Sequence, residues 1–411
     1  MITNIYEVSM LAVAISVLIS HSVASPTFER GDFKAGLKGN LELQSRVAKN
    51  SSAARSAPLN ENWTDGHFSM AQGNLNFRSE FKDSRVEVNW FFRHAQSSLY
   101  QENRKNVNLI NFPNVLVARD VFKLQYTRQD KDFRTDSILN SFYYELDGED
   151  SSFLIGRMII NYGSGEFFNP INPFNQPLGL TNQSNIHQAS DGMMASFYPS
   201  TRSKLNFYLL GDKNQEDYEN QITRTLWIQG EYTLSENLKA TYVIGEDQRR
   251  NKGGGELRYE EKSYALYLQS LYTSNLINRK ASENLFDLVL GFSRKMGERW
   301  KLSLETGYQE RDRRISNLNV LNFEDRLLPF EVFVAPGVMI NLTDTWVSQT
   351  HIVYDPKSEF VFGKTRLSWN FSNHSALDLF ASSPLSIKRE QASLGQRLLT
   401  TDLGLSLRLM F

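Results

Sequence analysis

The chain contains no cysteine, so it can hold neither a disulfide framework nor thiol chemistry. It also has no run of 18 consecutive apolar residues, which excludes a membrane protein built from spanning helices. With 45 basic and 46 acidic residues its formal net charge is −1, which gives no reason to expect a nucleic acid as partner. Aromatic residues, in contrast, are plentiful, with 27 Phe and 17 Tyr. This composition fits a chain that crosses a membrane as a closed barrel, in which lipid-facing and lumen-facing residues alternate.

The N-terminal segment has the pattern of a secretory signal. A run of ten mostly apolar residues from Met10 to Ile19 is too short to span a bilayer, and small residues follow at Ser22 and Ala24. The segment before the run departs from the pattern, because it carries Glu7 and no Lys or Arg. We predict a signal peptide over residues 1–24, cleaved after Ala24, and a single barrel domain over 25–411. The alternative is a buried helix.

The last ten residues read as an amphipathic β-strand. Apolar side chains alternate strictly with Gly404, Ser406, Arg408 and Met410, at positions Leu403, Leu405, Leu407, Leu409 and Phe411. Such alternation gives one apolar and one polar face. The segment resembles the terminal strand of bacterial outer-membrane β-barrels, which ends in an aromatic residue and is recognised by the barrel-assembly machinery. A soluble antiparallel sheet is the alternative.

Alternating segments of about ten residues recur along the whole chain, which is the length of a tilted membrane strand. The connections between them come in two sizes. Short polar turns are expected at 82–84, 147–150, 235–237, 297–299 and 342–344, and long loops at 48–66, 163–188, 247–255, 310–328 and 382–400. Short turns on one side and long loops on the other are typical of outer-membrane barrels. We therefore predict an all-β fold, a transmembrane antiparallel β-barrel of the bacterial outer membrane with about 18 strands; 16 and 20 are the alternatives.

Placing the apolar face of each strand outward assigns basic side chains to the lumen. The predicted pore-lining residues are Arg46, Arg78, Arg85, Arg93, Lys123, Arg157, Lys301, Lys364, Arg366 and Arg408. For Arg157 this assumes that Leu154, Met158 and Ile160 face lipid. Because fewer acids fall on these faces, the lumen should favour anions, since charged rings focus the potential in a narrow pore. The alternative is that these are solvated charges without a selective role.

The segment from Gly163 to Gln188 is the most distinctive connection. Its prolines restrict the backbone and its asparagines favour turns, so an ordered loop is expected, and a connection of this length is often functional. It could fold inward and narrow the pore, or remain a surface loop. The residues expected at the constriction are Glu166, Phe167, Phe168, Asn169, Pro170, Asn172, Pro173 and Phe174.

The stretch from Gly156 to Gln176 also resembles a pattern of porin-like outer-membrane families, including alginate-export barrels. In those families a G-R-Q strand leads to a W-G step and a loop containing N-P. Here Gly156-Arg157 matches, Met158 replaces the Gln, Tyr162-Gly163 stands for Trp-Gly, and Asn169-Pro170 and Asn172-Pro173 match the loop. The resemblance covers some 40 residues. It implies a passive channel or exporter with Arg157 in the lumen and indicates no substrate.

Nothing in the sequence indicates an enzyme, a metal site or a cofactor. The six His residues include no pair at metal-ligand spacing, and the Gly253-Gly254-Gly255 run lacks the Lys-Ser/Thr of a phosphate-binding loop and reads as a loop tip. The expected function is therefore an outer-membrane porin for small hydrophilic solutes, with a bias toward anions. The alternatives are a dedicated channel for an acidic saccharide or an aromatic acid, and a barrel whose loops bind a cell surface. The expected partners are lipid, the assembly machinery and solutes, and a homotrimer is a conceivable assembly.

Overall fold

The computed structural model describes residues 27–50, 66–97, 125–129, 133–174, 189–213, 222–247, 250–275, 284–310, 331–386 and 400–410. These residues form twenty β-strands. The first ten are β1 (Thr27–Arg30), β2 (Phe33–Asn50), β3 (Gly66–Phe81), β4 (Ser84–Ser97), β5 (Gln125–Gln129), β6 (Phe133–Asp147), β7 (Ser151–Ile159), β8 (Ala189–Ser200), β9 (Ser203–Lys213) and β10 (Ile222–Thr233). The others are β11 (Leu238–Asp247), β12 (Arg250–Glu260), β13 (Tyr264–Asn275), β14 (Leu285–Met296), β15 (Trp300–Gln309), β16 (Val332–Asn341), β17 (Trp346–Asp355), β18 (Phe360–Ser372), β19 (Ser375–Ser386) and β20 (Thr400–Met410). Among the described residues, no helix is long and apolar enough to cross a membrane.

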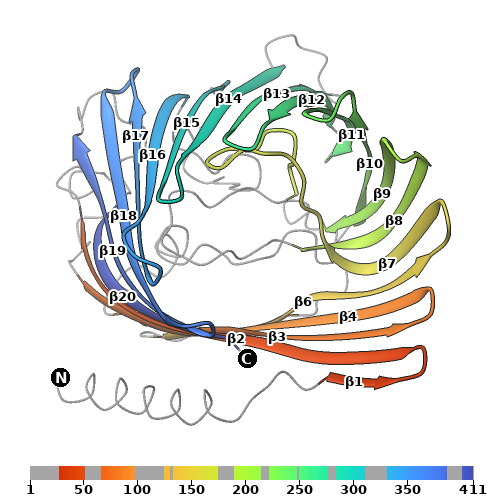
Figure 1. Ribbon diagram of the computed structural model, residues 1–411, viewed down its shortest axis with the longest axis horizontal. Helices are drawn as coiled ribbons and strands as arrows, with labels where there is room; N and C mark the ends of the chain where they lie inside the picture. The colour runs from red at the N-terminus through yellow and green to blue at the C-terminus, as the bar shows by residue number, and fades with distance from the viewer. Residues whose placement is uncertain are drawn as a thin grey trace.

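Eighteen of these strands close into a ring (Figure 1). Each pairs antiparallel with the next along the chain, and β20 pairs with β2, so that Leu43 lies opposite Leu407 at the closing seam. Two strands lie outside the ring. Strand β1 pairs with the start of β2, and β5 pairs with residues 134–138 of β6, a part of β6 that also pairs with β4. Closure removes the unpaired sheet edges that an open sheet would expose. The predicted all-β barrel and its count of 18 are confirmed.

The wall is apolar on its outer face and polar on its inner face. Strand β14 shows the pattern, since the exposed Phe286, Leu288 and Leu290 alternate with the buried Asp287 and Val289. Exposed large apolar side chains of this kind occur on strands all around the ring. A soluble protein rarely leaves so much apolar surface in water, whereas lipid is the solvent that such a surface requires.

Short turns gather at one end of the barrel, here called the turn end. The five predicted short turns are confirmed in place, with Lys82 and Gly297 in the left-handed conformation that tight turns use. Aromatic side chains cluster near the same end, where Trp346 of β17 stacks on Trp369 of β18 with ring centroids 5.6 Å apart. Such residues are typical of the belt where a barrel meets the membrane interface.

One predicted loop is wrong. Residues 247–255 form no long connection, because β11 ends at Asp247 and β12 begins at Arg250, and Gly253, Gly254 and Gly255 lie within β12. Without side chains at three successive positions, the apolar alternation that marks the other strands is invisible there. A Cβ added at Gly254 would also clash with the neighbouring Ser270 carbonyl, so this position favours glycine.

Candidate functional site

Residues 160–174, here called the infolded loop, leave β7 and lie inside the ring (Figure 1). The turn at Gly163 needs glycine, since its φ is +83° and an added Cβ would strike the Asn169 amide. Asn169 donates from Nδ2 to the Tyr162 carbonyl at 2.6 Å, and Asn172 donates to the carbonyls of Ile160 and Tyr162 at 3.3 Å. The asparagines therefore order this part of the loop, as its sequence predicts. Residues 175–188 of the predicted constriction lie outside the described residues.

A buried carboxylate of the wall holds the middle of the infolded loop. Glu305 of β15 accepts hydrogen bonds from three successive backbone N–H groups, those of Glu166, Phe167 and Phe168, at 2.7, 3.1 and 2.9 Å. The Tyr267 hydroxyl donates a fourth at 2.5 Å. Hydrogen bonds to an ionised acceptor are about twice as strong as neutral ones. Glu305 is thus the main polar anchor of the loop among the described contacts.

A second carboxylate fastens the start of the same loop. Glu256 of β12 accepts from the Ser164 backbone N–H at 2.8 Å and from its hydroxyl at 3.0 Å, and Gln269 also donates to it. Arg258 donates to the Ser164 Oγ at 3.1 Å. Sequence reasoning missed Glu256 and Arg258 as site residues because their strand was taken for a loop.

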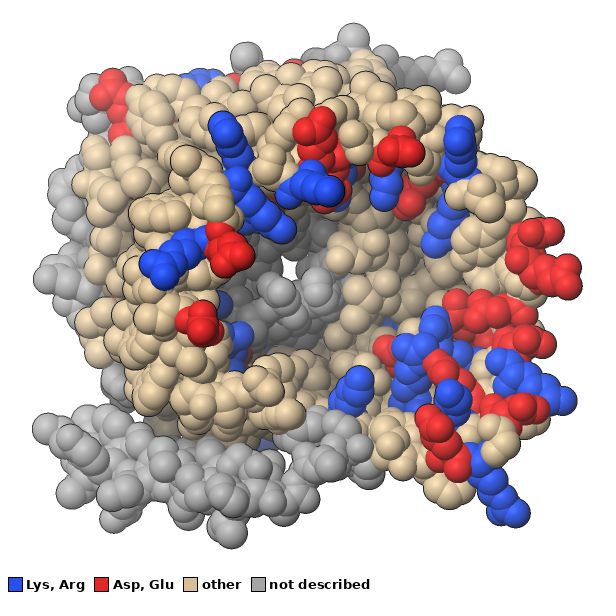
Figure 2. All heavy atoms as spheres, viewed as in Figure 1, with Lys and Arg blue, Asp and Glu red and all other residues tan. Residues whose placement is uncertain are grey.

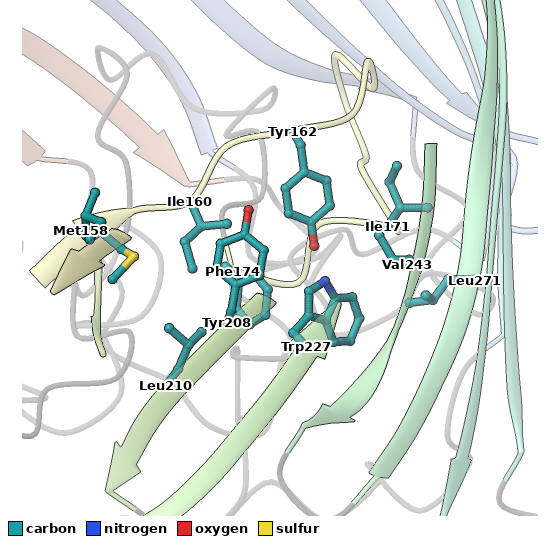
Figure 3. Packing of buried hydrophobic residues seen from close by; sticks show 11 residues of the cluster. Met158, Ile160, Tyr162, Ile171, Phe174, Tyr208, Leu210, Trp227, Val243 and Leu271 are labelled. Atoms are coloured by element: carbon teal, nitrogen blue, oxygen red, sulfur yellow. The ribbon is translucent and has the colours of Figure 1, made fainter. Parts of the chain in front are cut away.

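The first apolar cluster packs the ends of the infolded loop against β7, β9, β10, β11 and β13 (Figure 3). Phe174 is 1% exposed and meets the Trp227 ring edge-on, with centroids 5.3 Å apart. Its members are Leu154, Met158, Ile160, Tyr162, Ile171, Phe174, Tyr208, Leu210, Trp227, Val243 and Leu271. Burying an aromatic side chain of this size contributes about 3 kcal/mol, so the cluster holds the loop without charge.

The second apolar cluster receives the two phenylalanines at the middle of the infolded loop. Phe167 and Phe168 pack with residues of strands β13, β14, β16, β17 and β18, and Phe167 also meets the His351 ring edge-on at 5.2 Å. The wall residues of this cluster are Tyr267, Val289, Phe333, Ala335, Val353, Phe360 and Phe362. Together the two clusters tie the loop to strands from β7 to β18.

Most predicted pore-lining cations are paired with carboxylates. Ion pairs join Arg78 to Glu80, Arg85 to Glu145, Arg93 to Asp136, Arg157 to Asp191, Lys301 to Glu166 and Arg408 to Asp378. Asp136 lies within β6. Six of the ten predicted cations therefore have a carboxylate neighbour, and the preference of the lumen for anions stays a prediction.

The other four predicted cations fall into two groups. Lys364 and Arg366 lie on the inner face of β18, in line with the buried Phe360 and Phe362. These two residues are here called the basic side of the lumen. Lys123 and the side chain of Arg46 lie outside the described residues.

The predicted faces of β7 are reversed. Leu154, Met158 and Ile160 pack into the first apolar cluster inside the ring, while Phe153 and Ile155 are about 40% exposed on the outer face. Arg157 is 5% exposed, and its Nε and Nη2 donate to the two Asp191 oxygens at 2.6 and 2.9 Å. The two faces of β7 were assigned wrongly because its inner face is also apolar: the infolded loop packs against it and covers it. Arg157 is held in an ion pair of the wall.

Seen end-on, Lys and Arg side chains lie beside Asp and Glu side chains along the upper and left rim of a central hollow, and a second group of charged side chains lies away from the hollow at the lower right (Figure 2). Polar side chains in the ring thus face a passage narrowed by a loop. No group of three or more His, Asp or Glu among the described residues could hold a metal ion.

Comparisons with known proteins agree on the fold. No protein-family model matches the chain, and no curated protein matches it in sequence. The solved structures that match include Acinetobacter baumannii OccAB4 (TM-score 0.57, 11% identity, 93% of this chain and 99% of that one), Pseudomonas aeruginosa OccK5 (0.56, 10%, 91% and 98%) and a BenF-like porin from Pseudomonas fluorescens Pf-5 (0.57, 8%, 92% and 98%). At these identities the likeness establishes a shared fold. The resemblance to porin-like outer-membrane barrels is confirmed at that level.

Proposed function

We propose that this chain is an outer-membrane channel through which small hydrophilic solutes, including anions, diffuse passively. The observation that carries this proposal is a closed ring of eighteen strands, apolar outside and polar inside, with a loop folded into it. A barrel of about eight strands is filled by its own side chains, whereas one of sixteen to eighteen leaves an aqueous channel. The porin structures with the same fold support the proposal by analogy.

The infolded loop sets the width of the passage in this mechanism. Because Glu305, Glu256 and two apolar clusters fix it, the narrowing is a rigid part of the wall. Solutes would pass it hydrated, between the loop and the polar inner faces of the strands. Lys364 and Arg366 provide the basic side that would draw anions, since positive side chains in a narrow pore lower the energy of an anion more than that of a cation.

The location and assembly of the protein follow from the same proposal. The apolar outer face lies in lipid, a signal peptide over residues 1–24 directs export, and the assembly machinery reads the terminal strand that ends at Phe411. Mass analysis of the mature protein would test cleavage after Ala24. A homotrimer would bury part of the apolar wall, and its mass in mild detergent would identify it.

Planar-bilayer conductance of the purified, refolded protein tests the function. A steady open conductance, with a reversal potential in a salt gradient that indicates anion preference, is the expected result. An open conductance without anion preference would still support a passive channel, but it would contradict the proposal that the basic side attracts anions. A barrel that stays silent would contradict passive diffusion, and would favour a gated carrier or a barrel whose loops bind a partner.

A further inference from the structure

A cavity of about 320 Å³ lies between the start of the infolded loop and the wall. Its lining comes from strands β4 and β6 to β10 together with loop residues Ile160, Asn161 and Tyr162. The residues that define its chemistry are Glu87, Ser141, Tyr143, Lys204, Tyr208 and Glu231. None of these belongs to the predicted pore-lining or constriction residues. The cavity is large enough for a single-ring molecule and lies on the lumen side of the wall.

Two carboxylates give the cavity a negative charge. Glu87 accepts from the Tyr143 hydroxyl at 2.8 Å and from Asn76 Nδ2 at 3.3 Å, and Glu231 accepts from Gln229 Nε2 at 2.6 Å. These donors are neutral, and the cross-strand neighbours of the two carboxylates are Arg78, which pairs with Glu80, beside Glu87, and Lys204 beside Glu231. Lys204 is the one cation in the lining, and two carboxylates against one ammonium group leave a net charge of −1.

The remaining lining is apolar or aromatic. Leu154, Met158, Ile160 and Met194 contribute aliphatic surface, and the first three of these are buried in the first apolar cluster. Such a surface next to a few convergent polar groups is typical of small-molecule sites. A neutral or cationic molecule with a flat apolar part would therefore fill the cavity better than water does.

One buried hydroxyl in the lining has no partner. Ser141 is 1% exposed, and its Oγ has no hydrogen-bond partner in the described structure. Buried polar groups in proteins are nearly always satisfied, because an unsatisfied one costs about 1–3 kcal/mol. Since Ser141 lines the cavity, a molecule bound there can satisfy it. This observation is independent of the carboxylates and indicates a ligand at the same place.

We propose that this cavity is a binding site for a small solute with one ammonium group on an aromatic or apolar body. The ammonium group lies against one of the two carboxylates that line the cavity, Glu87 or Glu231, and the body lies on the aliphatic surface. A carboxylate in the same place would face a like charge, which raises its energy. The site defines a class of solute for the proposed channel. The passage of that solute rests on the proposed channel function, whereas its binding to the cavity does not.

Isothermal titration of the refolded protein with three matched probes tests the binding. Benzylammonium, benzyl alcohol and benzoate share one ring and differ in charge, and each titration is corrected against protein-free micelles. Benzylammonium should bind at least tenfold more tightly than either other probe. The double variant Glu87→Gln/Glu231→Gln should lose this preference, while Ser141→Ala should weaken binding a few-fold.

The control variant is Glu236→Gln/Glu298→Gln. Both residues are exposed in the short turns that follow β10 and β14 and lie outside the cavity, so the net charge changes equally. The control should keep the benzylammonium preference. Equal affinity for all three probes, or equal losses in both double variants, would overturn the proposal.

Conductance separates the failure of this inference from the failure of the channel. If the site binds in an open channel, benzylammonium should reduce the conductance of the wild type and leave that of Glu87→Gln/Glu231→Gln unchanged. A barrel that binds benzylammonium but conducts nothing would refute the channel and keep the site. A barrel that conducts in salt yet shows no preference for benzylammonium would refute the site and keep the channel.

Discussion

Replacing Glu305 by Ala should release the infolded loop while the barrel wall stays folded. The carboxylate accepts from three loop N–H groups and from Tyr267, and it forms no ion pair with the described residues of the wall. Removing it leaves three backbone donors without their acceptor. A hydrogen bond to a charged group contributes about 1.5–3 kcal/mol, so losing two of the three loop hydrogen bonds costs about 3–6 kcal/mol. Because 1.4 kcal/mol is a factor of ten, the share of released loop should rise by roughly 100- to 1000-fold or more.

Single-channel recording measures this release directly. Glu305→Ala should show a larger or noisier open current than the wild type, because the loop no longer holds one position in the lumen. Limited proteolysis between residues 160 and 174 should become faster, while the thermal unfolding of the wall changes little. Glu305→Gln should lie between the two, since its amide oxygen still accepts one or two of these hydrogen bonds.

Glu80→Gln is the matched control, because Glu80 also faces the lumen but its carboxylate pairs with Arg78 of its own strand and holds no part of the infolded loop among the described residues. It should leave the current noise and the proteolysis rate of the loop unchanged. If Glu305→Ala had the same current, noise and proteolysis rate as the wild type, the reasoning that the carboxylate holds a constricting loop would be refuted. A loss of barrel assembly would be resolved by Glu305→Gln, which keeps the side-chain volume.

Three further changes test other parts of the site. Gly163→Ala should displace the loop turn at a cost of about 1–3 kcal/mol, because its φ is +83° and the Asn169 amide occupies the space of the new methyl group; faster loop proteolysis would show this, and an unchanged rate would contradict it. Phe174→Ala should weaken loop packing by about 3–5 kcal/mol with little change in barrel melting, and current noise equal to that of the wild type would count against the packing argument. Lys364→Met and Arg366→Met should each lower anion-over-cation permeability about fourfold, since one positive charge about 10 Å away in water stabilises an anion and destabilises a cation by about 0.4 kcal/mol each; a reversal potential that does not move would remove the basic side from the mechanism.

The barrel was predictable from the sequence because its signals are local. Alternation along β14 or β20 and turns such as Gly297 need no knowledge of what lies across the lumen. The eighteen-strand count followed from spacing, and the loop predicted over 247–255 was wrong because three glycines hide the alternation of β12. The order of the infolded loop was predictable in the same way, since Asn169 acts within its own segment.

The partners of the charged residues were not predictable, because they depend on register between strands. Asp378 and Arg408 are 30 residues apart in sequence and meet because β19 pairs with β20 in one particular register. Asp191 meets Arg157 in the same way across β7 and β8. Alternation along a sequence predicts on which face of its strand a residue lies, but it does not predict which residue of opposite charge lies next to it on the neighbouring strand.

The infolded loop divides the inner wall into two chemically different parts. Its apolar contacts run from β7 to β18, where the wall carries Trp227 and Phe333 facing inward. The closing seam carries polar networks instead: Glu42 of β2 accepts from Gln72 at 2.9 Å and from Ser406 of β20 at 2.7 Å.

Hydrogen-bonded carboxylates and amides are stable beside water, whereas apolar side chains on a lumen face need a covering segment. The loop therefore follows the part of the wall that requires cover, and the hydrated path of a solute should follow the seam. This division also explains why inner faces that carry apolar residues, such as that of β7, were assigned to lipid from sequence alone.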